Sequence, residues 1–151
     1  MNKPLVIALG ADHGGVALKD RLAKALLDAG HVVQDFGTHG PASVDYPDFA
    51  AEVCGAIEAQ KADFGVLVCG TGIGMSIAAN RFAGIRCALV HDVTTARLTR
   101  AHNDANVLAL GARIIGEEVA LDVLTTFLTT PFEGGRHERR LAKINALTDG
   151  E

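Results

Sequence analysis

Short apolar runs alternate with amphipathic stretches along the first two thirds of the chain. Five runs have the length and composition of strands, at 5–9, 31–36, 64–69, 85–90 and 106–110. Their nearly unbroken apolarity is typical of strands covered on both faces, as in a parallel sheet. The stretches between them have helical periodicity, and the first is expected to end at Gly30, a residue type that favours helix C-termini.

This alternation predicts the fold class. Strand and helix alternate through the first 110 residues, which indicates a Rossmann-like, three-layer α/β fold with a five-stranded parallel sheet and helices on both faces. Segments 116–129 and 136–147 are predicted to be two terminal helices. Pro131 and the pair Gly134–Gly135 break the chain between them, so the last helix is free to pack on a partner subunit. We expect residues 1–151 to form one domain.

Composition and charge narrow the function classes. The 151 residues are 48% hydrophobic and 21% charged, as in an ordinary globular protein. A net charge of -4 argues against a general nucleic-acid surface, and no apolar run approaches the ~18 residues that span a bilayer. The three cysteines show no C-x-x-C spacing, which argues against a disulfide framework and against structural zinc. We therefore expect a cytoplasmic protein without a signal peptide or a membrane partner.

The most informative segment follows the third predicted strand. Cys69 ends that strand, and Gly70, Gly72 and Gly74 follow it before a helix that starts near Ile73. Glycines let a backbone approach a ligand closely, and successive N–H groups form a cradle for an anion or a developing oxyanion. The same positive field favours the thiolate of Cys69, which makes it a candidate base or nucleophile.

Other polar residues are predicted near the same edge of the sheet or in the C-terminal part. Asp12 and His13 follow the first strand, where they can bind hydroxyls or move protons; a turn Asp that caps the next helix is the alternative. Arg136 and Arg140 are four residues apart on one helix face, so both guanidinium groups can bind one phosphate. A solvated basic helix end is the alternative for them.

Several cofactor classes do not fit this sequence. The G-x-G-x-x-G pattern that begins at Gly70 fails because Met75 stands where its last glycine is required. The six histidines show no i, i+4 pair and no H-E-x-x-H spacing, so we expect no metal. The chain has no G-x-S-x-G elbow and no P-loop pattern. A site that has a base, an oxyanion cradle and a phosphate clamp but no cofactor is suited to proton transfer next to a carbonyl. Aldose–ketose isomerisation of a sugar phosphate is a reaction of this kind.

Five ordered motifs also resemble a known family over nearly the whole chain. The strings ADHGG, VDYPDFA, CGTGIGMSIAANRFAGIR, HNDANVLALGARIIG and FEGGRHERRLAKI are similar to those of the type B ribose-5-phosphate isomerases, within a wider family that includes galactose-6-phosphate isomerase subunits. The resemblance implies interconversion of ribose 5-phosphate and ribulose 5-phosphate through an enediolate. It also implies a homodimer with the site at the subunit interface, with a tetramer as an open alternative.

The resemblance implies a role for each matching residue. Cys69 would move the proton between C1 and C2, because Met75 replaces the glutamate base of other relatives. Thr71 and His102 would assist ring opening, and the remaining residues would bind the substrate: Asp12, His13, Tyr46, Gly70, Gly72, Ile73, Gly74, Asn103, Arg113, Arg136 and Arg140. The loop 38–44 is the expected wall against a longer sugar, and His39 within it is either a substrate contact or a solvated residue.

Alternatives to this activity remain open from the sequence. The preferred substrate can be allose 6-phosphate, galactose 6-phosphate or a tetrose phosphate instead of ribose 5-phosphate. A module that senses sugar phosphates needs the phosphate clamp but not the base. A redox role for Cys69 needs a resolving cysteine nearby, and none lies within a few residues of it.

Overall fold

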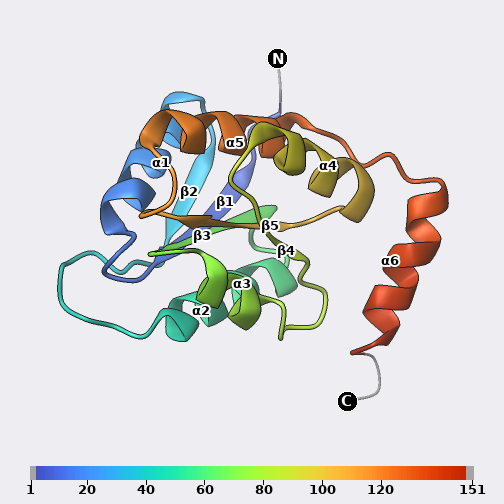
Figure 1. Ribbon diagram of the computed structural model, residues 1–151, viewed down its shortest axis with the longest axis horizontal. Coiled ribbons are helices and arrows are strands. Elements are labelled where there is room, and N and C mark those ends of the chain that lie inside the picture. Colours follow the sequence, from blue (N-terminus) through green and yellow to red (C-terminus); the bar gives the residue numbers. More distant parts are fainter. Residues whose placement is uncertain (1–2, 149–151) are drawn as a thin grey trace.

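The computed structural model describes residues 3–148 and has a parallel sheet between two layers of helices (Figure 1). In chain order the elements are β1 (Val6–Ala11), α1 (Val16–Asp28), β2 (Val32–Asp35), α2 (Tyr46–Glu58), β3 (Phe64–Cys69), α3 (Ile73–Ala79), β4 (Cys87–Leu89), α4 (Val93–Asn103), β5 (Val107–Gly111), α5 (Glu117–Thr129) and α6 (Arg136–Ala146). The predicted Rossmann-like α/β fold is therefore confirmed.

The five strands lie in the order β2-β1-β3-β5-β4, and all neighbours are parallel. The three central strands are almost completely buried, as their unbroken apolarity predicted. Ala11 lies beside Val68 and Cys69 lies beside Gly111. Because these strands end level with one another, the loops that follow them meet at one edge of the sheet, which we call the carboxyl edge.

Each face of the sheet has its own apolar layer. Helices α1, α4 and α5 cover one face with residues such as Leu22, Ala96 and Phe127, while α2 and α3 cover the other with residues such as Val53 and Met75 (Figure 1). Full burial of one large apolar side chain contributes ~1.5–3 kcal/mol. These layers hold the sheet rigidly, and with it the loops of the carboxyl edge.

Element boundaries follow local chemistry. Helix α1 ends at Asp28 with Ala29 as its C-cap, slightly before the predicted Gly30, which follows with a φ of +90° that suits glycine; Gly30 N–H donates to Leu27 O and His31 N–H donates to Leu26 O. Strand β4 is shorter than the predicted run 85–90, because this edge strand pairs with β5 over three residues only. Helix α6 starts at Arg136 as predicted and ends at Ala146 rather than at 147.

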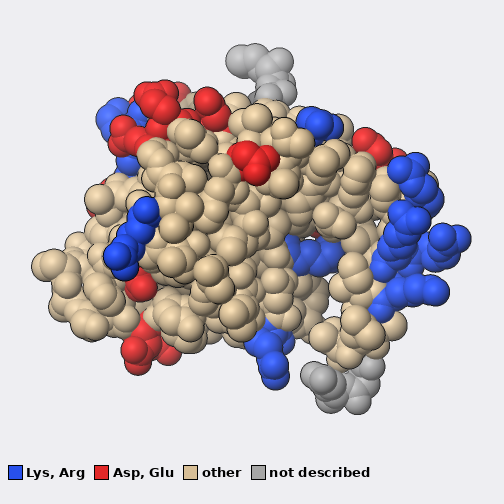
Figure 2. Space-filling view, viewed as in Figure 1, with Lys and Arg blue, Asp and Glu red and all other residues tan. Residues whose placement is uncertain are grey.

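Helix α6 lies at the side of the molecule, next to the end of α4 (Figure 1). Its inward side chains are His137 and Leu141, while the basic side chains are exposed along its outer side (Figure 2). A cavity of about 370 Å³ lies between the C-terminal part of α6 and the body of the molecule. Within residues 3–148, every helix is too short or too polar to cross a membrane.

Candidate active site

Cys69 is the last residue of β3, with 5% of its surface exposed. Its Sγ accepts a hydrogen bond of 3.2 Å from the N–H of Gly72. Gly72 has a φ of +78°, and a Cβ there would lie 2.8 Å from the carbonyl carbon of Leu110, so no other residue fits. The backbone of the glycine-rich loop therefore folds over the sulfur, and the Gly72 N–H stands beside the thiol.

The loop after β1 lies next to this turn. The carboxylate Oδ1 of Asp12 accepts a hydrogen bond of 2.9 Å from Gly14 N–H, and a Cβ on Gly14 would lie 3.7 Å from the backbone nitrogen of Gly70. Asp12 N–H donates to Val68 O at 3.2 Å. Two predicted binding segments, one after β1 and one after β3, are thus brought together at the carboxyl edge.

His13 connects this edge to the loop 38–44. Its Nδ1 accepts a hydrogen bond of 3.2 Å from Val44 N–H, so Nε2 carries the proton of the neutral ring. His13 is exposed, and it can donate from Nε2 to an oxygen of a ligand. His39 is also exposed, and its ring lies against Gly37.

Three further predicted residues surround the glycine-rich loop. A Cβ on Gly74 would lie 2.5 Å from Cζ of Tyr46, so the half-exposed tyrosine ring packs directly on this glycine. A Cβ on Gly70 would lie 3.2 Å from Cδ of Arg113, whose N–H donates to Gly70 O at 2.9 Å. Thr71 Oγ1 accepts from the N–H of Ile73 at 3.3 Å, and both residues are exposed.

The remaining predicted residues gather elsewhere. His102 and Asn103 end α4, and Arg136 and Arg140 lie one turn apart on α6, exposed to solvent. The N–H of Glu133 donates to Ala101 O at 3.0 Å, which fixes the start of the α6 segment against the end of α4. These four residues form a second group, which we call the α4–α6 group.

The sheet keeps the two groups apart within one chain. Helix α4 runs antiparallel to the strands, and after His102 the chain enters β5 at Val107, which lies beside Gly65. Cys69 is four residues further along β3, about 13 Å at the usual rise per residue. The α4–α6 group therefore lies toward the amino ends of the strands, opposite the carboxyl edge that holds the thiol. The motifs alone do not reveal this separation.

A cluster that sequence analysis missed adjoins the α4–α6 group. The rings of His102 and His137 stack with centroids 4.4 Å apart and planes 17° apart, and each Nε2 lies within 4 Å of the Glu133 carboxylate. Burial lowers the pKa of His137, with further contributions from Arg136 and His102, so its ring is held neutral. The only signal in the sequence is the i, i+4 spacing of Glu133 and His137.

These three side chains are the group that comes nearest to a metal site among residues 3–148, with ligand atoms within 4.8 Å of one another. A ring nitrogen directs its lone pair in the plane of the ring, and two nearly parallel, stacked rings cannot direct both lone pairs at one ion. The arrangement therefore suits stacking and charge balance better than metal binding.

The other two thiols lie away from the glycine-rich loop. Burial and the charge of Glu58 raise the pKa of Cys54 to about 12, and burial likewise raises the pKa of Cys87. Both pack in the apolar layer under α2 and α3, and both remain protonated at neutral pH. Their burial and their protonation suit a structural role.

Comparison with known proteins identifies the relatives of this chain. Residues 7–144 match the family model described as Ribose/Galactose Isomerase. The chain is 44% identical to ribose-5-phosphate isomerase B of Escherichia coli over 141 residues, which are 93% of this chain and 95% of that protein.

Solved structures agree with the sequence match. Ribose-5-phosphate isomerase B of Clostridium thermocellum superposes with a TM-score of 0.94 at 49% identity, covering 95% of this chain and 97% of that one. The crystal structure of a ribose 5-phosphate isomerase from Thermotoga maritima gives a TM-score of 0.93 at 52% identity, covering 94% and 98%.

Proposed function

Because the chain belongs to the ribose/galactose isomerase family, we propose that it interconverts ribose 5-phosphate and ribulose 5-phosphate. The observation that carries this proposal is the Cys69 thiol at the end of β3, which accepts a hydrogen bond from the Gly72 N–H of the glycine-rich loop. A base beside an oxyanion cradle is what proton transfer next to a carbonyl requires.

The reaction follows from these groups without an external electron donor or acceptor. The Cys69 thiolate removes the proton from C2 of open-chain ribose 5-phosphate, and the electron pair forms the C1–C2 double bond while negative charge moves to the C1 oxygen. A proton passes between the two oxygens, and the thiol returns its proton to C1 to give ribulose 5-phosphate. The Gly72 N–H donates to sulfur, and the loop N–H groups stabilise the enediolate.

The other residues at the carboxyl edge have binding roles in this proposal. Asp12 and His13 bind sugar hydroxyls, with His13 donating from Nε2. Tyr46 closes the pocket over Gly74, and Arg113 brings a positive charge beside Gly70. Thr71 assists opening of the furanose ring together with His102.

We further propose that two copies of the chain build each site. His102, Asn103, Arg136 and Arg140 lie too far from Cys69 to act with it in one chain, but in a twofold dimer they can complete the partner's site. Exposed apolar residues support such a contact: Ile144 and Leu147 line the cavity beside α6 and are 46% and 78% exposed. A surface of this kind is costly to leave in water and favours association.

The activity is tested with the purified protein in deuterated water containing a chelator. Ribose 5-phosphate, allose 6-phosphate and erythrose 4-phosphate are supplied separately, and isomerisation and deuterium incorporation are followed by NMR. We expect ribose 5-phosphate to react fastest. If another sugar phosphate reacts faster, the proposed substrate is wrong; if none reacts while phosphate still binds, a sensing role is favoured.

The base is tested by Cys69→Ala, with Cys87→Ala as the matched control because that thiol is half-buried and protonated. Removal of a general base is expected to lower kcat by at least ~100-fold while inorganic phosphate still binds. Cys87→Ala is expected to retain turnover. Equal turnover in the Cys69 variant and the native chain would exclude the assigned base.

A further inference from the structure

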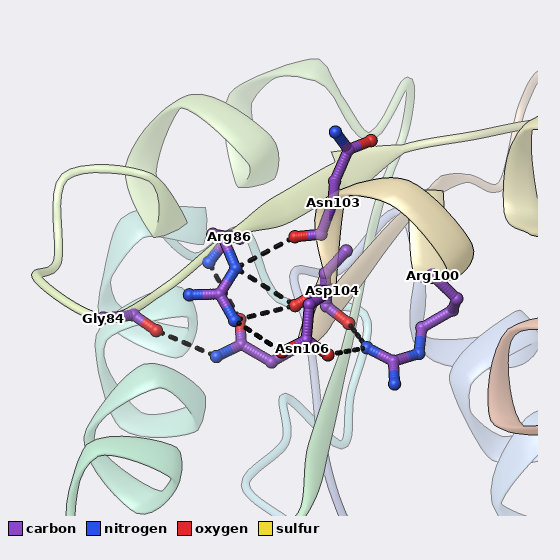
Figure 3. Close-up of polar contacts among 7 residues, drawn as sticks. Gly84, Arg86, Arg100, Asn103, Asp104 and Asn106 are labelled. Carbon is purple, nitrogen blue, oxygen red and sulfur yellow. Dashed lines mark hydrogen bonds and ion pairs between the residues drawn. The ribbon is translucent and has the colours of Figure 1, made fainter. Parts of the chain in front are cut away.

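An arginine–aspartate cluster holds the end of α4 at Asn103 (Figure 3), and His102 is the preceding residue in the chain. Asp104 follows the helix with a φ of +45°, in the left-handed region that usually favours glycine. Its carboxylate accepts a hydrogen bond of 2.8 Å from Arg100 and one of 3.3 Å from Arg86. A non-glycine residue in this conformation is thus held between two guanidinium groups.

The same two arginines bind backbone carbonyl groups at the end of α4 and just beyond it, while Asp104 N–H and Ala105 N–H donate to Arg100 O and Thr99 O within the helix. Arg86 donates to Asn103 O at 3.0 Å and to Asp104 O at 2.8 Å, and Arg100 donates to Ala105 O at 2.6 Å. Helix ends leave up to four carbonyls without intrahelical partners, and these are ordinarily bound by water or by a glycine motif. Here charged side chains fix three consecutive carbonyls.

Neighbouring contacts make the cluster rigid. Arg100 is 8% exposed, and its guanidinium carbon lies 4.8 Å from the centre of the Phe64 ring. Asn106 accepts from Arg86 N–H at 2.8 Å and donates to Gly84 O at 2.8 Å, which binds the segment before β4 to the start of β5. The side chain of Asn103 points away from this cluster, while its backbone is held within it (Figure 3).

The cluster joins residues of two sequence motifs, and the proposed reaction gives these residues no role. Arg86 ends the segment that begins with Cys69, and Asp104 and Asn106 follow His102 and Asn103. A plain helix end needs only a glycine, whereas here a half-exposed Asp104 carboxylate is paired with two arginines, one of them largely buried. The cluster costs free energy through desolvation of its charges and through the left-handed backbone of Asp104. Such a cost is expected where the neighbouring side chains must be held in a fixed orientation.

We propose that Arg86, Arg100 and Asp104 are positioning residues that fix the end of α4, so that His102 and Asn103 meet the substrate in a productive orientation. This inference rests on the proposed isomerase function. The three residues act through the α4 backbone and do not touch the substrate. Small displacements of reacting groups cost up to ~100-fold in rate, so loosening this end of α4 lowers kcat.

The test compares Asp104→Asn with Arg86→Lys and a control. Asparagine tolerates the left-handed conformation, so Asp104→Asn removes the charge while retaining the shape of the turn. Arg86→Lys retains the charge but lacks the planar guanidinium fork that holds two carbonyls and the Asp104 carboxylate in fixed directions, and Arg86 is partly exposed, so the variant is expected to fold. Asp28→Asn is the matched control, because Lys24 and Asp28 form an i, i+4 pair like Arg100 and Asp104 but are exposed on α1.

The readouts are kcat and KM for ribose 5-phosphate, the inhibition constant of inorganic phosphate, and the solution mass of each variant. The native chain is assayed first; if it has no activity, the proposed function fails and not this inference. We expect Asp104→Asn and Arg86→Lys to lower kcat at least about tenfold, with KM, phosphate inhibition and mass unchanged, and Asp28→Asn to match the native chain.

Three outcomes would overturn the inference. The first is a kcat within twofold of the native value in both variants. The second is a parallel loss of kcat and phosphate affinity, which indicates general loss of structure. The third is a loss of kcat only in variants whose solution mass falls, which assigns the cluster to subunit assembly.

Discussion

Two inactive variants of this protein should restore activity to one another when they form mixed dimers. Cys69→Ala removes the base at the carboxyl edge but leaves the α4–α6 group intact, and His102→Asn does the reverse. These residues lie toward opposite ends of the strands, because His102 precedes the start of β5, which lies beside Gly65, and Cys69 is about 13 Å further along β3. In a twofold dimer with shared sites, each mixed dimer therefore has one site with both residues intact and one site with neither.

The size of the recovery follows from this geometry. With random pairing of equal amounts, about half of the dimers are mixed and one of their two sites is native, so activity returns to about a quarter of the native value. Mixed dimers isolated by themselves should reach about half. Each parent variant is expected to lose at least ~100-fold, so the recovered signal stands well above the background.

The assay uses two copies of the chain with different affinity tags, expressed together and purified through both tags before ribose 5-phosphate turnover is measured. The control pairs Cys69→Ala with Thr71→Ala, since both residues belong to the carboxyl edge and no mixed dimer then contains a native site. Activity no greater than the sum of the parents in the Cys69–His102 mixture would refute the shared site. Equal recovery in the control mixture would refute it as well.

Three smaller predictions test local parts of the structure. Gly74→Ala places a Cβ 2.5 Å from Cζ of Tyr46, so steady-state kinetics should show a raised KM with little change in Tm, because the half-exposed ring can turn away. Hydrogen bonds to its carboxylate lower the pKa of Asp92 at the start of α4. Asp92→Ala should therefore lower Tm by its full amount at any pH above about 4, and melting curves should show the difference from the native chain fading as pH falls through the lowered pKa. In urea unfolding, Asp35→Asn should lower the free energy of unfolding by about 2–3 kcal/mol, because it leaves the buried Lys19 ammonium short of a partner. Lys19→Met should lower it less, because this variant removes the buried charge itself.

The layers of the fold are predictable from this sequence because burial on both faces leaves a simple mark. The run Phe64–Cys69 is apolar apart from one glycine, and it forms the central strand β3. The order of the last two strands is not predictable in the same way: β5 lies next to β3 while β4 is at the edge. Both strands are short and apolar, and their order depends on how α3, α4 and α5 pack over the sheet.

The candidate site likewise has a part that can be predicted from the sequence and a part that cannot. Residues that directly follow strands, such as Asp12 and Cys69, are brought together by a rule of parallel sheets, so their proximity is predictable. The contacts of His137 with His102 and of Arg86 with Asp104 join ends of helices and strands that are distant in sequence, and no periodicity encodes them.

The rigidity of the sheet explains why these two kinds of residue lie apart within one chain. A flexible chain could fold the end of α4 back toward the thiol, but α4 packs against α5 and leads directly into β5, whose register with β3 is fixed by backbone hydrogen bonds. The same packing that holds Cys69 beside the Gly72 N–H therefore keeps His102 away from it in one chain. Our proposal therefore requires a second copy of the chain to bring its α4–α6 group to the thiol, and the mixed-dimer assay tests this requirement directly.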